Sequence, residues 1–151
     1  MVNQPESKAH ELLDHSDDAV IKTMEMYQAV ITRMASNSAA CKQWCIPLVT
    51  AIIVFAVKEK SYQLIGVTLI PILICYCLDS YYLMLENSFR VGFHQAATKM
   101  AEDRFTRADL FSLLPAGCRS QLLLKALISP ATWPVYLGLV AMSLVAYKLA
   151  G

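Results

Sequence analysis

Charged residues stand at matching places on either side of a short turn. The turn, around Glu59, separates two uncharged runs, 43–57 and 61–78. If both runs are helices that fold back on each other, residues equally far from the turn face one another, because each arm rises about 1.5 Å per residue. The facing pairs are then Lys42 with Asp79, and Arg33 with Glu86. We expect these residues to form an interfacial charge clamp that fixes the register of the hairpin; the alternative is a gate at the mouth of a pore.

Small polar side chains recur along one face of the second run, at steps of seven, seven and four residues. They are Ser61, Thr68, Cys75 and Asp79. Polar groups inside a membrane face a water-filled cavity or another helix. The stripe is therefore a candidate pore lining, and the alternative is interhelical packing by small polar residues. A similar stripe on a third apolar run leaves the same alternatives open: Thr132, Tyr136, Ser143 and Tyr147.

Basic residues alternate with aromatic ones after the second run. The basic residues are Arg90, Lys99, Arg104, Arg107 and Arg119, and the aromatic ones are Phe89, Phe93, Phe105 and Phe111. Positive charge combined with stacking side chains is what single-stranded nucleic acid requires. These basic residues are the candidate ligand-binding set. Contact with anionic lipid is the alternative interpretation.

The sequence offers little for catalysis. His10, His15 and His94 do not have the spacing of metal ligands, and no glycine-rich phosphate loop, Ser-His-Asp order or H-E-x-x-H motif is present. The cysteines are interpreted as small hydrophobic side chains in a reducing compartment, with a metal or redox site as the alternative: Cys41, Cys45, Cys75, Cys77 and Cys118. We therefore expect no enzyme activity, no cofactor and no metal centre.

The composition is that of a membrane protein. Hydrophobic residues make up 56% of the chain and charged residues 17%, against about 45–50% and about 25% in soluble domains. A third uncharged run, 126–147, is long enough to span a bilayer. Lysine and arginine concentrate before the first run and between residues 79 and 125. The positive-inside rule then places the N-terminus and the segment 79–125 in the cytoplasm.

These patterns predict an all-α membrane protein with three transmembrane helices, two of which extend into a cytoplasmic helical-bundle stalk. An apolar seam at spacings of three and four runs from Val20 to Met34, and a second from Leu78 to Ala96. We expect Pro47 and Pro71 to kink the long helices. The expected segments are a mobile acidic arm (1–16), a cytoplasmic helix continuing into the first span (17–58), the second span continuing into a cytoplasmic helix (61–103), a cytoplasmic connector (104–125) and the third span (126–149).

Two short motifs resemble a known family. One is Arg33-Met34-Ala35-Ser36-Asn37-Ser38, followed by Lys42 and Trp44. The other is Leu78-Asp79-Ser80-Tyr81-Tyr82-Leu83, followed by Glu86, Phe89 and Arg90. With the Leu-Ile-Ser-Pro sequence at 127–130, they resemble the small bacterial membrane effectors encoded beside nucleotidyltransferases in anti-phage defence. The chain is most similar to the membrane component of Hailong-type systems and more distantly to the two-span SLATT effectors. The resemblance covers roughly residues 20–90 and, more loosely, 126–150.

The resemblance implies a homo-oligomeric ion channel, such as a tetramer, in the bacterial inner membrane. It implies an effector of abortive infection that depolarises this membrane and is gated by an oligonucleotide from the partner nucleotidyltransferase. In Hailong-like systems the ligand is expected to be a single-stranded DNA oligomer that holds the channel shut. The alternative is a non-conducting membrane scaffold or anchor that recruits a soluble partner through its stalk.

Overall fold

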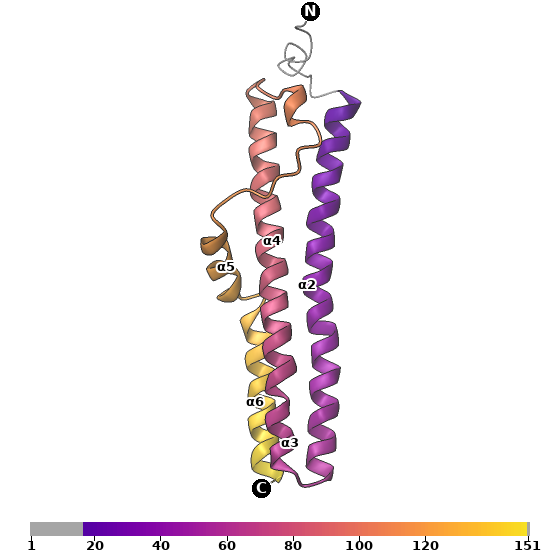
Figure 1. Ribbon diagram of the computed structural model, residues 1–151, viewed down its shortest axis with the longest axis vertical. Helices are drawn as coiled ribbons and strands as arrows, with labels where there is room; N and C mark the ends of the chain where they lie inside the picture. Colours follow the sequence, from indigo (N-terminus) through magenta and orange to yellow (C-terminus); the bar gives the residue numbers. More distant parts are fainter. Residues whose placement is uncertain (1–16, 151) are drawn as a thin grey trace, which may run out of the picture.

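The computed structural model describes residues 17–150, and these residues form helices and connecting segments without a β-strand. Two long helices run antiparallel side by side, and a third apolar helix lies beside one half of the pair (Figure 1). The elements are α2 (Asp18–Lys58), α3 (Tyr62–Val67), α4 (Leu69–Ala101), the 3-10 turn η1 (Arg107–Asp109), α5 (Arg119–Leu127) and α6 (Trp133–Ala150). The all-helical prediction is confirmed. The expected acidic arm, 1–16, lies outside the described residues.

Both long helices have well-defined ends. Asp17 caps α2 by accepting a hydrogen bond from the Ala19 N–H at 3.0 Å, as expected for an acidic residue at this position. Beyond the last turn of each helix, one residue adopts a left-handed conformation, Lys60 at φ 49° and Asp103 at φ 51°. The N–H groups that follow bond back into the last turn, from Ser61 to Ala56 O at 2.9 Å and from Arg104 to Lys99 O at 2.8 Å. This pattern satisfies the terminal carbonyls and turns the chain sharply.

The second long helix is interrupted at Thr68, where α3 gives way to α4. The interruption lies three residues before Pro71, the proline at which a kink was expected. The reason is that proline lacks an N–H and its ring displaces the carbonyl four residues earlier, which belongs to Val67. The Thr68 hydroxyl donates to Ile65 O at 2.6 Å at this point of the chain. Pro47, by contrast, lies within an unbroken α2.

The third apolar run does not form one helix from residue 126, so this boundary was predicted wrongly. Its first two residues close α5, and α6 begins only at Trp133. Pro130 cannot donate a backbone hydrogen bond, and a turn forms in which the Thr132 and Trp133 N–H groups both bond to Ser129 O, at 2.9 and 3.2 Å. The 18 residues of α6 are about 27 Å long.

Large apolar side chains are exposed over much of the three-helix half of the molecule. Examples on three helices are Val54 (64% exposed), Leu73 (63%) and Leu144 (61%). Two helices, Asp18–Lys58 and the combined Gln63–Ala101, are long and apolar enough to cross a membrane, and the apolar helix Trp133–Leu149 is shorter. Monomeric soluble proteins rarely leave continuous apolar faces of this size uncovered.

The contact face of α4 differs from the expected apolar seam. Leu78 is 45% exposed, and the buried residues are mostly small or polar. They are Ile72, Asp79, Ser80, Met84, Glu86, Ser88 and Gly92. They do not form one stripe, because α4 packs against α2 on one side and against α5 on the other. On α2, buried residues do follow a single stripe that includes Val20, Tyr27 and Ile31 of the expected seam.

The segment between α4 and α5, residues 102–118, is called the connector from here on. Its backbone is attached to the long helices. The Ser88 hydroxyl donates to Ala116 O at 2.9 Å, and the Ala116 N–H donates to Ser88 O at 3.1 Å. The Tyr27 hydroxyl donates to Ser112 O at 2.9 Å. Gly92 allows this approach, since a Cβ there would lie 2.7 Å from Leu114 O. The side chain of Leu114 is itself 68% exposed, whereas that of Phe105 is buried at 2%, so the connector is held by polar groups, a close backbone contact and one apolar anchor.

We predict that Gly92→Ala destabilises the fold by about 1–3 kcal/mol, because the new methyl group overpacks a site walled by backbone. Gly66→Ala is the matched control, since a Cβ at Gly66 meets no atom within 4 Å. There the helix propensity of alanine should leave stability unchanged or slightly higher. Reversible SDS unfolding in detergent micelles measures both variants. Equal stabilities for the two would show that the connector does not press on α4 at this point.

Candidate functional site

A buried ion pair joins the two long helices. Lys42 Nζ on α2 lies 2.6 Å from Asp79 Oδ2 on α4, and the Asp79 side chain is 0% exposed whereas that of Lys42 is 21% exposed. Ser38, one helical turn before Lys42, donates a hydrogen bond to Asp79 Oδ1. The hairpin register therefore brings Lys42 and Asp79 together as expected. A carboxylate excluded from solvent is stable only with such partners.

The third helix meets the same region through Tyr136. This side chain is 4% exposed, and its hydroxyl donates to Cys75 O at 3.2 Å. The hydroxyl also lies close enough to Asp79 to interact with its carboxylate. Residues of α2, α4 and α6 thus converge on one polar junction, defined by Ser38, Lys42, Asp79 and Tyr136.

The sequence missed two features of this junction. One is Ser38, whose hydrogen bond to Asp79 was not among the expected contacts of the clamp. The usable signal was its spacing of four residues from Lys42, which puts both on the same helix face. Tyr136 belonged to the polar stripe of the third run, but nothing in the sequence indicated which residues of the second run it meets.

Arg33 is not part of the clamp, which corrects the prediction for this residue. Glu86 pairs instead with Arg90 of its own helix, at 2.6 Å between Oε1 and the guanidinium nitrogen. Arg33 is exposed, because it falls between the buried positions Ile31 and Ser38 on the turn that faces away from α4. Matching the two arms residue by residue predicted the position of Arg33 along the bundle axis, but it did not predict which side of α2 the residue lies on.

The candidate pore-lining residues are divided by the structure. Thr68 and Asp79 are fully buried inside the bundle, and Thr68 Oγ1 lies 3.1 Å from Ser143 Oγ of α6. Ser61 and Cys75 are half-buried. In this conformation Thr68 and Asp79 join helices within one chain, and they do not face a path outside it. On the third run, Thr132 and Ser143 are buried as well, whereas Tyr147 is 51% exposed.

Several of the candidate ligand-binding cations already have carboxylate partners. Arg90 pairs with Glu86, Lys99 with Asp109 at 2.5 Å, and Arg104 with Glu102. Arg107 and Arg119 are exposed. Among the aromatic residues, Phe105 is buried at 2% exposure, so it cannot stack on a ligand, whereas Phe111 is 56% exposed. The expected basic and aromatic surface is therefore partly neutralised and partly buried in this conformation.

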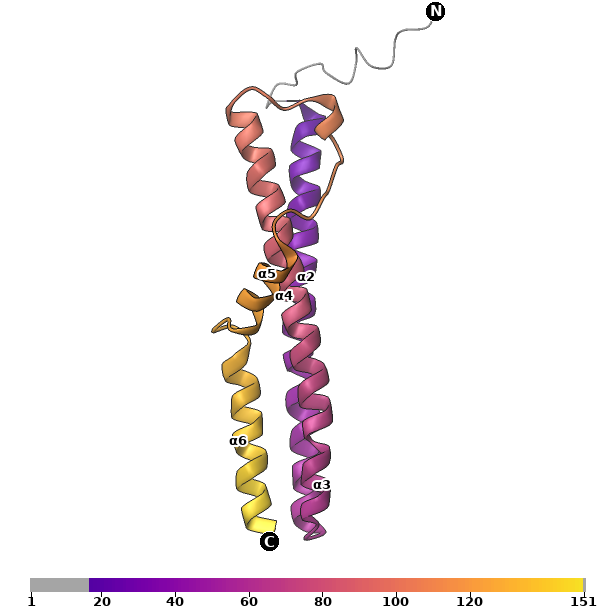
Figure 2. The same ribbon diagram turned by 60° about the vertical axis from the view of Figure 1, so that its left-hand side comes forward.

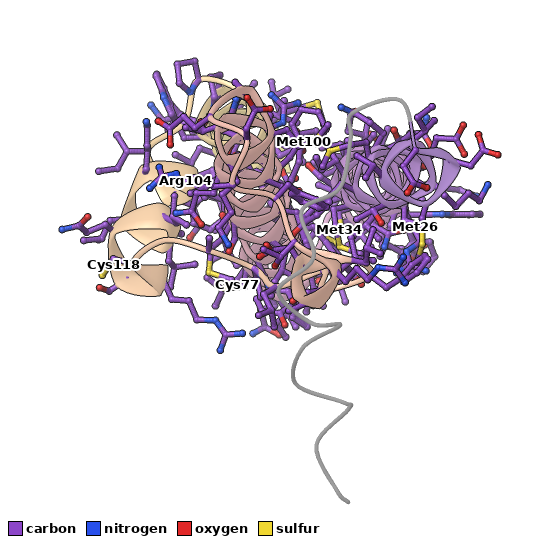
Figure 3. All side chains as sticks on the ribbon, turned by 90° about the horizontal axis from the view of Figure 1, so that it is seen from above. Met26, Met34, Cys77, Met100, Arg104 and Cys118 are labelled. Atoms are coloured by element: carbon purple, nitrogen blue, oxygen red, sulfur yellow. The ribbon has the colours of Figure 1, made fainter. Side chains whose placement is uncertain are left out.

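The five cysteines are free thiols, and Cys41, Cys45 and Cys75 lie near one another. Cys45 is buried, Cys41 and Cys75 are half-buried, and Cys77 and Cys118 are exposed. Seen along the bundle, Cys118 lies at the outer edge beside α5, whereas Met34 and Met100 lie near the long helices (Figure 3). Within residues 17–150, no group of three histidine, cysteine or acidic side chains is placed to hold a metal ion.

Asp109 fixes the connector near the end of α4. Burial alone raises the pKa of Asp109, but hydrogen bonds from Lys99 and from the backbone and side chain of Thr106 outweigh it and hold the pKa below its ordinary value of 3.8. The Thr106 N–H and hydroxyl both donate to Asp109 Oδ2, at 3.1 and 2.9 Å. The ionised carboxylate therefore closes the turn η1 and ties it to α4.

A carboxyl group whose pKa is lower in the folded state stabilises the fold above its unfolded pKa, and this contribution is lost as the pH falls through the folded value. We predict that Asp109→Asn costs about 1 kcal/mol at pH about 6. The difference from wild type should shrink as the pH falls below about 4. Unfolding free energies of both proteins across this range measure it. Glu25→Gln, at an exposed pair, is the control, and a constant difference at all pH values would contradict the assignment.

The ion pair predicts an asymmetric response to substitution. Lys42→Gln leaves the fully buried Asp79 without its cation and should cost about 3–5 kcal/mol. Asp79→Asn should cost less, because Lys42 is partly exposed and can extend toward solvent. The double variant should be more stable than Lys42→Gln alone. A double-mutant cycle by SDS unfolding tests this, with Lys22→Gln at the exposed Lys22–Glu25 pair as a control within about 0.5 kcal/mol of wild type. Strict additivity of the two substitutions would exclude a direct pair.

Comparison with protein-family models, with curated proteins and with solved structures found no match for this chain.

Proposed function

We propose that the chain is the subunit of an oligomeric ion channel in the bacterial inner membrane. In this proposal α2, the α3–α4 pair and α6 cross the bilayer with their exposed apolar faces toward lipid. The support is the exposure of large apolar side chains on all three helices and the placement of charged residues at the ends of the uncharged runs. The N-terminus and the connector lie in the cytoplasm, as the distribution of lysine and arginine favours.

The observation that carries the proposal is the buried Lys42–Asp79 pair. Ionisable residues within membrane helices are costly and usually mark an ion or substrate pathway. The pair stands where the uncharged runs of both long helices end, so it lies at the cytoplasmic end of the spans. In the closed state Lys42 and Ser38 hold the carboxylate inside the subunit. In the open state the helices shift so that Asp79 and Thr68 face a water-filled path between subunits.

The resemblance supplies the regulator, a single-stranded DNA oligomer made by a partner nucleotidyltransferase that holds the channel shut. Such a ligand shifts the equilibrium only if it binds the closed state more tightly than the open one. Its phosphates would compete with Glu86, Glu102 and Asp109 for their cations, and Arg119 and Phe111 are exposed. Binding by this exchange should weaken with salt.

A non-conducting scaffold is the second candidate. It is favoured by the burial of Thr68 and Asp79, since both groups already have structural roles inside one chain. A scaffold would recruit its soluble partner through the cytoplasmic ends of α2 and α4, and it would pass no ions in any ligand state.

Ion flux through proteoliposomes that contain only the purified chain separates these functions. We predict flux that short single-stranded DNA suppresses. Asp79→Asn, which removes the internal lock, should leak at least about tenfold more than wild type in saturating DNA, since 1.4 kcal/mol corresponds to a tenfold change. Glu25→Gln, at an exposed pair remote from the junction, should behave as wild type. An intact oligomer that conducts under neither condition would favour the scaffold.

A further inference from the structure

An apolar groove lies between α4 and α6 on the outside of the bundle. Its volume is about 420 Å³, and Leu69, Leu73, Tyr76, Trp133, Leu137 and Val140 line it. This volume falls within the range of small-molecule sites in proteins, about 300–1,000 Å³. The groove is open toward the exposed apolar faces of both helices, which include Leu73 at 63% and Leu137 at 58% exposure.

The groove offers a ligand almost no polar partner. The Tyr76 hydroxyl donates to Leu127 O at 3.0 Å, and the Tyr136 hydroxyl beside it donates to Cys75 O at 3.2 Å. The two rings meet edge to face, with centroids 5.4 Å apart, and close the inner wall. With both hydroxyls bonded inside the protein, the wall presents carbon atoms, which suits a hydrocarbon chain.

Near the groove, the charged residues of α5 are basic, and the buried carboxylate of Asp79 is already paired with Lys42. The hydrogen bond from Tyr76 to Leu127 places the end of α5 at the rim, and Lys125, two residues earlier, is exposed. Arg119 at the start of α5 is exposed too. From residue 110 to the C-terminus the sequence contains no aspartate or glutamate. Figure 2 shows α5 and the turn after it on the same side of the long helices as α6.

We infer that this groove binds one acyl chain of an anionic phospholipid, with the headgroup beside Lys125 and Arg119. The site rests on the proposed membrane location. Trp133, 44% exposed at the start of α6, stands at the level where tryptophan meets headgroups. The exposed side chains of Leu124 (59%) and Ile128 (73%) give α5 and the turn after it an apolar surface of the kind that rests on a bilayer. A second copy fits less well, because its equivalent segment would bring like charge against Lys125 and Arg119.

The two tryptophans of the chain provide the test and its control. Trp133 lines the groove, whereas Trp44, 76% exposed on α2, does not. Single-tryptophan proteins, Trp44→Phe and Trp133→Phe, are reconstituted with lipids brominated near the headgroup end of the acyl chain. Quenching is compared between phosphatidylglycerol and phosphatidylcholine. We expect Trp133 to favour phosphatidylglycerol about fivefold, the effect of one basic residue at an anionic surface, and Trp44 to show no preference.

Charge variants assign the headgroup contact. Lys125→Gln in the Trp133-only protein should abolish most of the preference, and Lys148→Gln, at the far end of α6, should leave it unchanged. Equal preference at both tryptophans would overturn the lipid site. Quenching of Trp44 without quenching of Trp133 would also overturn it, because protein would then cover the groove. If neither tryptophan is quenched, the chain is not in the bilayer, and the proposed function fails together with the site.

Discussion

The buried ion pair between Lys42 and Asp79 is the interaction on which the arrangement of the long helices depends. Asp79 has no access to solvent, and an unpaired carboxylate there would cost several kcal/mol. The partners lie on opposite arms of the hairpin, and a slip of one arm by a residue would also turn its side chains by about 100° around the helix axis, which would separate them. The pair therefore fixes the register, and Tyr136 extends the same junction to α6.

Small and polar residues add contacts between helices beside an apolar cluster that includes Val49, Ile72 and Leu139. Ser88 and Gly92 receive the backbone of the connector, and Thr68 meets Ser143. This is the chemistry expected where apolar side chains gain little by leaving their surroundings, because lipid is as apolar as leucine. In the proposed membrane location, the large apolar side chains that point outward meet lipid. Polar pairs of this kind have discrete arrangements, which suits the proposed change between two helix packings.

The half of the molecule that is proposed to be cytoplasmic carries surface ion pairs in place of buried ones. Its cations are paired at the surface with neighbouring carboxylates, and such pairs contribute little stability. They are therefore easily exchanged for another anion. Lys99 and Asp109 link α4 to η1, so exchange at this point would also loosen the connector, whose backbone is bonded to Thr23 and Tyr27 of α2. A ligand at this end could thereby influence the packing of the long helices.

The sequence by itself determined the helical class, the bounds of α2 and the pairing of Lys42 with Asp79. Uncharged runs, capping residues and equal rise per residue are local or one-dimensional properties, and these suffice for such features. Only the tertiary structure decided the directions of side chains around each helix axis. Arg33 faces away from α4, although its predicted position along the bundle axis was right. Thr68 is enclosed by α6. The helix α4 buries residues against two neighbours, α2 and α5. Each outcome depends on which elements pack against a helix, and periodicity along one segment does not contain that information.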